Sequence, residues 1–252
     1  MKKSLLALAL LPVVLAGCGS TATKGTPAPG RTLTVFAAAS LTESFKALGR
    51  TFEAAHPGVK VTFNFGASSA LAQQITQGAP ADVFAAASPA TMKTVTDAGD
   101  ATAPKTFVKN RLEIAVPPAN PGKIVALKDL ANAKLKVVLC APQVPCGAAA
   151  IKALGAAGLK VTPVSQEQDV KAALTKVELG EADAALVYRT DVKSAGDKVK
   201  GIDFPESLKA INAYPIAVLA KAPQAALAQE FTQLVTSAPG QQVLQQAGFE
   251  AP

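Results

Sequence analysis

Hydrophobic and polar positions along this chain follow two periods that alternate with each other. Short apolar runs bounded by turn residues indicate buried strands, and stretches with an apolar residue every three or four positions indicate amphipathic helices. The expected strands are Leu33–Ala39, Val59–Phe65, Val83–Ala87, Leu112–Val116, Lys136–Leu139, Ala184–Tyr188 and Tyr214–Ala220. The expected helices are Leu41–His56, Ser69–Gln77, Ala90–Ala98, Ala148–Leu154, Val170–Leu179, Gln224–Thr236 and Gly240–Ala247. Strands that alternate with helices of this length predict an α/β fold built on a parallel sheet.

One hexapeptide, VFAAAS, occurs twice and ends at Ser40 and again at Ser88. Its flanking sequences differ, so the repeat predicts no domain duplication, only two buried strands that each lead into a helix through a serine. Ser40 is followed three residues later by Glu43, which is the pattern of a capping box. Ser88 is followed by Pro89, which has no N–H to offer a ligand. We therefore expect Ser40 to bind a ligand and Ser88 only to cap its helix.

Polar residues also precede other predicted helices, namely Ser68 and Ser69 in one case and Asp169 in another. Taken singly, each is more often a helix cap than a ligand. In open α/β sheets, however, ligands bind beyond the carboxyl ends of the strands, where the free N–H groups and dipoles of helix N-termini favour an anion. Several such caps that converge would therefore form an anion site.

The first residues indicate export. A short basic segment is followed by an apolar run too short to span a bilayer, and the run ends in Leu15-Ala16-Gly17-Cys18, which resembles a bacterial lipobox. We expect a signal peptide over 1–17, a lipid on the sulfur of Cys18 and a flexible tether over 18–30, because the latter is small, polar and proline-containing. The alternative is an ordinary export signal that contains a cysteine.

Charge and histidine content reduce the number of ligand classes that the protein is expected to bind. The formal net charge of +7 falls by two when Lys2 and Lys3 leave with the signal, and the remaining basic surface either attracts an anion or serves solubility. No basic run with interleaved aromatic residues is present, so nucleic acid is not an expected partner. The single histidine, His56, excludes a multi-histidine metal site; it lies at a predicted helix end, and we interpret it as structural.

An exported hydrolase with a serine nucleophile is the alternative from a different class. The chain has no G-x-S-x-G and no S-x-x-K pattern, and His56 is its only imidazole base. Ser68, within GASSA, resembles a nucleophile elbow only superficially. The sequence therefore favours a binding protein over an enzyme.

Five segments together carry a family resemblance that covers Leu33–Phe249. The chain resembles the periplasmic molybdate-binding proteins of molybdate ABC transporters in VFAAASLTESF, FNFGASSALAQQITQGAPADVFAAAS, VPCGAAAIKAL, QDVKAALTKVELGEADAALVYRTDV and YPIAVL. This resemblance implies a type II periplasmic binding fold, in which two α/β lobes are joined by a hinge of two chain crossings and hold an oxyanion between them. The implied segments are 31–112 for the first lobe, 113–216 for the second and 217–252 for the return, with crossings near Asn110–Val116 and Ala213–Val218.

The resemblance also implies a set of ligands. Its molybdate-binding positions fall on Ser40, Ser68, Cys146, Val170 and Tyr188 of this sequence. The serines would each give a hydroxyl and a backbone N–H, Cys146 and Val170 a backbone N–H, and Tyr188 its hydroxyl. The family often has alanine at the position of Cys146, a change that leaves the backbone donor in place. All five are neutral donors, and a buried dianion without a counter-ion requires several of them.

The remaining implications concern transport. The ligand would be molybdate or tungstate, no cofactor would be needed, and the partner would be the membrane permease of an ABC transporter. The protein would be a monomer in the periplasm or on the outer face of the cell membrane, anchored through Cys18. The alternative within this class is a carrier of another oxyanion, such as sulfate or thiosulfate.

Two further cysteines, Cys140 and Cys146, lie six positions apart, one at the end of a predicted strand and one at the start of a predicted helix. Because an exported chain leaves the reducing cytosol, we expect a disulfide between them that fastens the APQVP loop. The alternative is two unlinked thiols.

Overall fold

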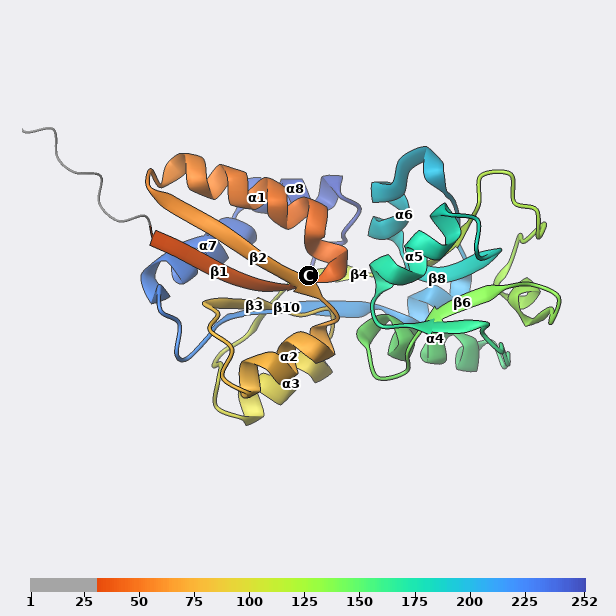
Figure 1. Cartoon of the computed structure of the whole chain (residues 1–252), viewed down its shortest axis with the longest axis horizontal. Helices are drawn as coiled ribbons and strands as arrows, with labels where there is room; N and C mark the ends of the chain where they lie inside the picture. The colour runs from red at the N-terminus through yellow and green to blue at the C-terminus, as the bar shows by residue number, and fades with distance from the viewer. Residues whose placement is uncertain (1–30) are drawn as a thin grey trace, which may run out of the picture.

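The computed structural model describes residues 31–252, which form two α/β lobes that lie side by side (Figure 1). The expected signal peptide, the lipidated Cys18 and the tether lie outside the described residues. Within 31–252, no helix is both long enough and apolar enough to cross a membrane.

The first lobe is built on a five-stranded sheet with the order β2-β1-β3-β10-β4. Its strands are β1 (Arg31–Ala38), β2 (Val59–Gly66), β3 (Val83–Ala85), β4 (Lys105–Asn110) and β10 (Asn212–Val218). β1 pairs in parallel with β2 and β3, whereas β10 pairs antiparallel with β3 and β4. The expectation of a parallel sheet therefore holds for β1, β2 and β3 and is wrong for β10 and β4. β10 brings the chain back from the second lobe, so it runs opposite to the strands that lead outward.

Helices cover both faces of this sheet (Figure 1). One face carries α1 (Thr42–Ala55), α7 (Ala225–Thr236) and α8 (Ala238–Gln246), and the other carries α2 (Ser68–Thr76) and α3 (Pro89–Asp97). Successive side chains of a strand point to opposite faces, so Val35 belongs to the first of the two cores and Phe36 to the second. The apolar run of β1 is continuous because both of its faces are covered.

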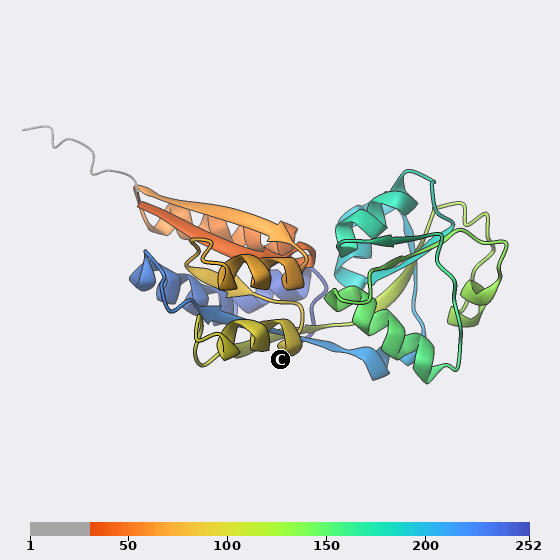
Figure 2. The same cartoon turned by 60° about the horizontal axis from the view of Figure 1, so that its bottom comes forward.

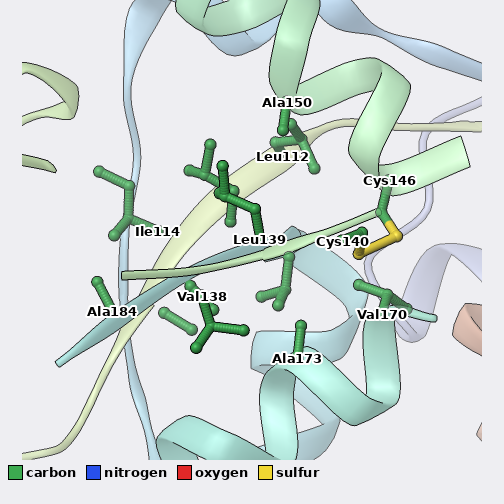
Figure 3. Close-up of a cluster of buried hydrophobic side chains, with 14 of the residues drawn as sticks. Leu112, Ile114, Val138, Leu139, Cys140, Cys146, Ala150, Val170, Ala173 and Ala184 are labelled. Atoms are coloured by element: carbon green, nitrogen blue, oxygen red, sulfur yellow. A yellow bond between two sulfur atoms is a disulfide. The ribbon is translucent and has the colours of Figure 1, made fainter. Parts of the chain in front are cut away.

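The second lobe contains another five-stranded sheet, with the order β7-β6-β8-β5-β9. Its strands are β5 (Leu112–Val116), β6 (Val137–Cys140), β7 (Ser165–Glu167), β8 (Ala184–Tyr188) and β9 (Lys200–Ile202). Its helices are α4 (Pro145–Ala156), α5 (Val170–Glu178) and α6 (Arg189–Ala195), with short 3-10 helices at Leu127–Ala131, Gly196–Lys198 and Pro205–Ala210. α4 and α5 pack on opposite faces of the sheet (Figure 3). This sheet is also mixed, because β5 pairs antiparallel with β8 and β9.

The chain passes between the lobes twice, through neighbouring segments (Figure 2). It leaves the first sheet after Asn110 and enters the second at Leu112, and it returns at Asn212, whose register partner across the strands is Asn110. The whole of β10 pairs within the first sheet, so the boundary drawn at residue 216 from the sequence shifts to before Asn212. Helices α7 and α8 pack in the core of the first lobe.

Candidate functional site

A pocket lies where the two lobes meet, and it contains about 230 Å³ of empty space, part of it open to solvent. Its lining comes from the ends of β1, β2 and β8 and from the starts of α2, α4 and α5, and it includes all five residues expected as ligands, Ser40, Ser68, Cys146, Val170 and Tyr188. Of that space, about 20 Å³ can be reached by the centre of a water-sized sphere, which is little more than the room that one water molecule needs. The site therefore suits a small ligand.

Ser40 lies in a 3-10 turn, Ala39–Leu41, that joins β1 to α1. The expected capping box is wrong: Leu41 is the N-cap of α1 and no side chain caps it. The hydroxyl of Ser40 instead lies 2.9 Å from that of Tyr214, and the Glu43 carboxylate lies 3.1 Å from the ammonium of Lys171 in the second lobe. Ser40 is buried and faces the pocket.

Ser68 is the first residue of α2 rather than its cap, because Ala67 is the N-cap and no side chain bonds to the first turn. The cap expected from Ser68 and Ser69 is therefore wrong. The Ser68 hydroxyl oxygen accepts a 2.9 Å hydrogen bond from the backbone N–H of Ala87. Since that bond uses the oxygen as acceptor, the hydroxyl hydrogen is left to donate into the pocket.

Cys146 is the second residue of α4, after Pro145, which has no N–H to give. Its sulfur is bonded to that of Cys140 at the end of β6, so the expected disulfide is present (Figure 3). The loop between them is also held by close packing: a Cβ on Gly147 would lie 1.9 Å from the carbonyl oxygen of Ala141, so only glycine fits there. The backbone N–H of Cys146 is one of the first-turn donors that a helix leaves unpaired.

Val170 begins α5, and Asp169 caps that helix as expected. The Asp169 carboxylate accepts hydrogen bonds from the N–H groups of Lys171 (2.8 Å) and Ala172 (3.0 Å) through a single oxygen. The cap therefore satisfies the second and third donors of the helix and leaves the first, the N–H of Val170, for a ligand at the pocket.

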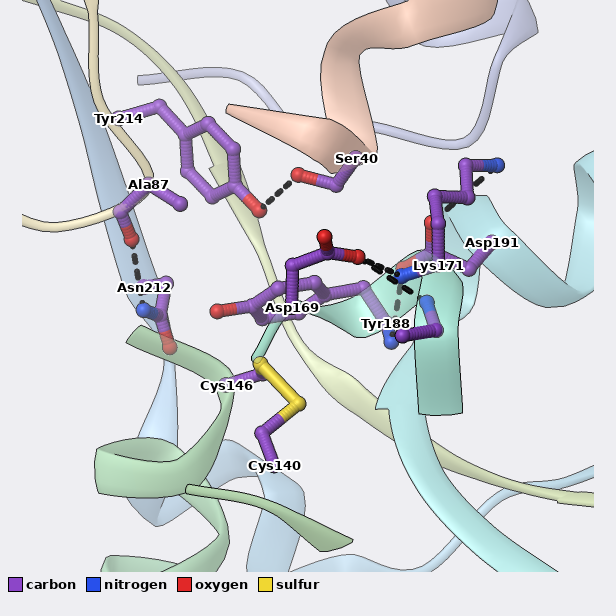
Figure 4. The surroundings of a disulfide bond; sticks show 11 residues. Ser40, Ala87, Cys140, Cys146, Asp169, Lys171, Tyr188, Asp191, Asn212 and Tyr214 are labelled. Carbon is purple, nitrogen blue, oxygen red and sulfur yellow. Dashed lines mark hydrogen bonds and ion pairs between the residues drawn. A yellow bond between two sulfur atoms is a disulfide. The ribbon is translucent and has the colours of Figure 1, made fainter. Parts of the chain in front are cut away.

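Tyr188 ends β8 and is 1% exposed. Its hydroxyl has no hydrogen-bond partner among the described residues, which is costly for a buried polar group. Burial raises the pKa of Tyr188 well above its usual value, so the hydroxyl keeps its proton and remains a donor. Figure 4 shows it near Ser40 and Cys146, which belong to the same pocket lining.

Cations do not contribute to this lining, in which Asp169 is the one charged residue. The nearby Lys171 is directed elsewhere: its ammonium lies 3.1 Å from Glu43 of the first lobe and 3.4 Å from Asp191. Burial raises the pKa of Asp191 to about 6, while the charge of Lys171 opposes that rise. Apart from Asp169, the pocket thus presents neutral hydrogen-bond donors, and an ion pair joins the lobes beside it.

Two other expectations concern residues away from the pocket. Ser88 accepts a hydrogen bond from the N–H of Thr91 and caps α3, and it is absent from the pocket lining. His56 bonds to the carbonyl of Phe52 and to Glu230, in keeping with a structural role at the end of α1. Residues 31–252 contain no cluster of side chains suited to hold a metal ion.

Sequence reasoning missed the polar residues that support the pocket from the hinge. Tyr214 contacts Ser40 through its hydroxyl, and the side chain of Asn110 contacts Tyr214 in turn. Asn212 donates from its side chain to the carbonyl of Ala87 (Figure 4). An available signal was the presence of Asn212 and Tyr214 in β10, a strand that is otherwise apolar.

Comparison with known sequences gives a consistent result. A family model described as bacterial extracellular solute-binding protein matches residues 33–250. The molybdate-binding protein ModA of Mycobacterium tuberculosis is 45% identical over 249 residues, which cover 97% of this chain and 95% of that protein. The putative ABC transporter substrate-binding lipoprotein YvgL of Bacillus subtilis is 30% identical, and the match covers 95% of this chain and 94% of that protein.

Comparison with solved structures concerns the fold. The periplasmic molybdate-binding protein of Azotobacter vinelandii superposes with a TM-score of 0.77 at 21% identity, over 87% of this chain and 99% of that one. At this identity the likeness shows the fold alone. It confirms the expected α/β architecture of two lobes, the type II periplasmic binding fold.

Proposed function

This chain belongs to the bacterial extracellular solute-binding proteins and, within them, to the family of molybdate-binding proteins, and from that premise we propose its function. It captures molybdate between its two lobes and delivers the anion to the membrane permease of an ABC transporter. Members of this family are binding components of transport systems, so the chain is a binding protein and not an enzyme, and it needs no cofactor.

The observation that carries the proposal is the hydroxyl of Tyr188, which is buried at the pocket without a partner. Ser40 and Ser68 add hydroxyls from the first lobe, and the starts of α4 and α5 add the N–H groups of Cys146 and Val170 from the second. An oxyanion that accepts from both lobes at once satisfies these donors. Neutral donors and helix N-termini can stabilise a dianion without a cation.

Export and anchoring complete the proposal. The lipobox-like sequence before Cys18 supports a lipid anchor, and the relative from Bacillus subtilis is described as a lipoprotein. Tungstate is a tetrahedral dianion similar in size to molybdate, so we propose it as a second ligand of the same donors. Mass spectrometry of the protein purified from its host membrane tests the anchor: an unmodified Cys18 at the mature N-terminus would contradict it.

Calorimetric titration with molybdate, tungstate, sulfate and phosphate tests the ligand. Molybdate and tungstate should bind tightly. Sulfate has shorter bonds and cannot reach donors on both closed lobes at once. Losing one or two hydrogen bonds to a charged group, at about 1.5–3 kcal/mol each, weakens binding roughly ten-fold to ten-thousand-fold. Phosphate near neutral pH carries a proton, which donors cannot accept. Sulfate binding as tight as that of molybdate would instead favour a carrier of another oxyanion.

The variant Tyr188→Phe tests the site directly. Removing a hydroxyl that has no partner in the free protein should leave thermal stability unchanged or raise it, whereas molybdate affinity should fall roughly ten-fold or more, since a bond to a charged acceptor is lost. Paired thermal unfolding and titration separate the two effects. Unchanged molybdate affinity would remove Tyr188 from the site.

A further inference from the structure

A chain of buried hydrogen bonds runs from the hinge to the pocket. Asn110, at the end of β4, contacts the hydroxyl of Tyr214 in β10 at 3.4 Å, and that hydroxyl contacts the hydroxyl of Ser40 at 2.9 Å. The three side chains are 0–5% exposed, so water does not replace these partners. Figure 4 shows the contact between Tyr214 and Ser40.

The direction of this chain is fixed at its hinge end. The backbone N–H of Arg111 can only donate, and it bonds to the side-chain oxygen of Asn110 at 3.0 Å. The amide nitrogen of Asn110 must therefore face the opposite way, where it lies 2.9 Å from the hydroxyl oxygen of Thr190 and 3.4 Å from that of Tyr214. Because the amide nitrogen is a donor, the oxygen of Tyr214 accepts.

The donor direction continues into the pocket. Burial raises the pKa of Tyr214, which therefore keeps its hydroxyl hydrogen, and the partner left for that hydrogen is the oxygen of Ser40. Ser40 accepts from Tyr214, so its own hydrogen is directed to the pocket. The hydroxyl oxygen of Ser68 likewise accepts a hydrogen bond, from the N–H of Ala87, so its hydrogen is also free to donate into the pocket. Both serine hydroxyls are thus donors toward a ligand, although a free hydroxyl could also accept.

We propose that Tyr214 is a specificity-determining positioning residue, which holds the Ser40 hydroxyl as a donor and so selects an oxyanion that carries no proton. The inference rests on the proposed function and deepens it. It names the residue that makes the Ser40 hydroxyl, which could otherwise donate or accept, a donor. An anion that retains a proton needs an acceptor in the site. With Tyr214 in place one lone pair of the Ser40 oxygen is used and the Ser40 hydrogen faces the pocket, so this hydroxyl meets the anion as a donor. Of the Asp169 carboxylate, the oxygen that caps α5 already accepts from two N–H groups.

The test is the ratio of phosphate to molybdate dissociation constants, measured by titration for the wild type and for Tyr214→Phe. The phenyl ring retains the edge-on packing of Tyr214 against Tyr188 and Phe249, and thermal unfolding checks that the variant is folded. We expect molybdate to bind several-fold more weakly and phosphate to bind as before or better, so that the ratio falls about ten-fold. Equal weakening of both anions, or no change in either, would overturn the inference.

A second variant reverses the donor direction of these hydrogen bonds without a substitution at Tyr214 or Ser40. In Asn110→Asp a carboxylate oxygen replaces the donating amide, so the Tyr214 hydroxyl donates toward the hinge and Ser40 is released to accept. The ratio should fall here too. The matched control is Thr190→Val, which removes the other partner of the Asn110 amide and should leave the ratio unchanged. A fall of the same size in the control would assign the effect to general loosening of the hinge.

The wild-type titrations separate this inference from the proposed function. Sulfate carries no proton near neutral pH, so a wild type that binds sulfate but not molybdate overturns the proposed ligand alone, and sulfate then replaces molybdate in the ratio. A wild type that binds neither anion overturns both.

Discussion

The two copies of VFAAAS lie side by side in the first sheet and yet have different roles. β1 and β3 pair in parallel and in register, so that equivalent residues of the two copies lie opposite each other. The pairs are Val35 with Val83, Phe36 with Phe84 and Ala37 with Ala85. Beyond the strands the copies diverge: Ser40 faces the pocket, whereas Ser88 caps α3. Identical sequence and identical strand position therefore do not determine which serine can meet a ligand.

The difference arises from the neighbours of each strand end. After β3 the backbone is bonded within the first lobe and hinge, because the N–H of Ala86 donates to the carbonyl of Pro215, and Ala87 bonds to Ser68 and Asn212. Pro89 then starts α3 at once and makes Ser88 a cap. After β1 the chain makes a 3-10 turn, and Tyr214 directs the Ser40 side chain instead of a helix end. The comparison shows that the surroundings, not the hexapeptide, assign the function.

Replacing each serine in turn is the strongest way to break this comparison. Ser40→Ala removes a donor to a charged ligand and should weaken molybdate binding roughly 10- to 150-fold, from about 1.5–3 kcal/mol. Ser88→Ala is the matched control: it removes a helix cap worth about 1 kcal/mol of stability but should leave affinity unchanged. Titration and thermal unfolding of both variants decide the matter. A large affinity loss in Ser88→Ala would show that the copies have been assigned the wrong way round.

A buried carboxylate in the second lobe, that of Asp191, sharpens the comparison through pH, because an ion-pair network links it to the helix that follows the first copy. Glu43, three residues after Ser40, reaches Lys171, which also pairs with Asp191. Because burial raises the pKa of Asp191 to about 6, from an ordinary value of 3.8, the folded protein holds this proton between those pH values while the unfolded chain has lost it. Raising the pH through this window therefore lowers the stability of the fold, and above about 6 the effect is complete.

The measurement compares the free energy of unfolding of the wild type with that of Asp191→Asn from pH 4 to pH 7. The wild type should lose stability relative to the variant, on the order of 2 kcal/mol, as the pH rises to about 6. The amide of the variant can still accept from the N–H of Tyr188, as the carboxylate does. Parallel pH profiles for the two proteins would contradict the raised pKa.

The sequence predicted the strongly apolar or clearly periodic elements well because their patterns are local. β5 and β8 match the expected strands residue for residue, and Asp169 caps α5 as its position suggests. The missed elements were β4, β7, β9 and α6, which are short or polar and are stabilised by neighbours rather than by their own pattern. The parallel-sheet expectation failed for a similar reason, because the direction of β10 follows from the path of the chain between lobes.

The candidate site divides in the same way. The five expected ligands were found through a family resemblance and lie together in one pocket. The roles expected for Ser40 and Ser68 as caps were wrong, because each hydroxyl bonds to a residue far away in the sequence, Tyr214 and Ala87. A spacing rule describes contacts within a helix turn, and it contains no information on partners supplied by another strand.

The smallest expected effect compares the third residue after each serine. Glu43 follows Ser40 and forms an ion pair across the cleft with Lys171, whereas Thr91 follows Ser88 and bonds back to that serine within α3. An ion pair between partly exposed side chains contributes about 0.2–1 kcal/mol, and salt screens it. Since this pair can form only when the lobes are closed, Glu43→Gln should weaken molybdate binding by at most about five-fold at low ionic strength, with a smaller difference at high salt. Thr91→Val should bind molybdate as the wild type does at every salt concentration. Titrations at two ionic strengths test both variants. Equal affinities of Glu43→Gln and wild type at low salt would show that the pair does not hold the lobes together. Tyr214 and the ligand donors would then be the features that distinguish the two copies.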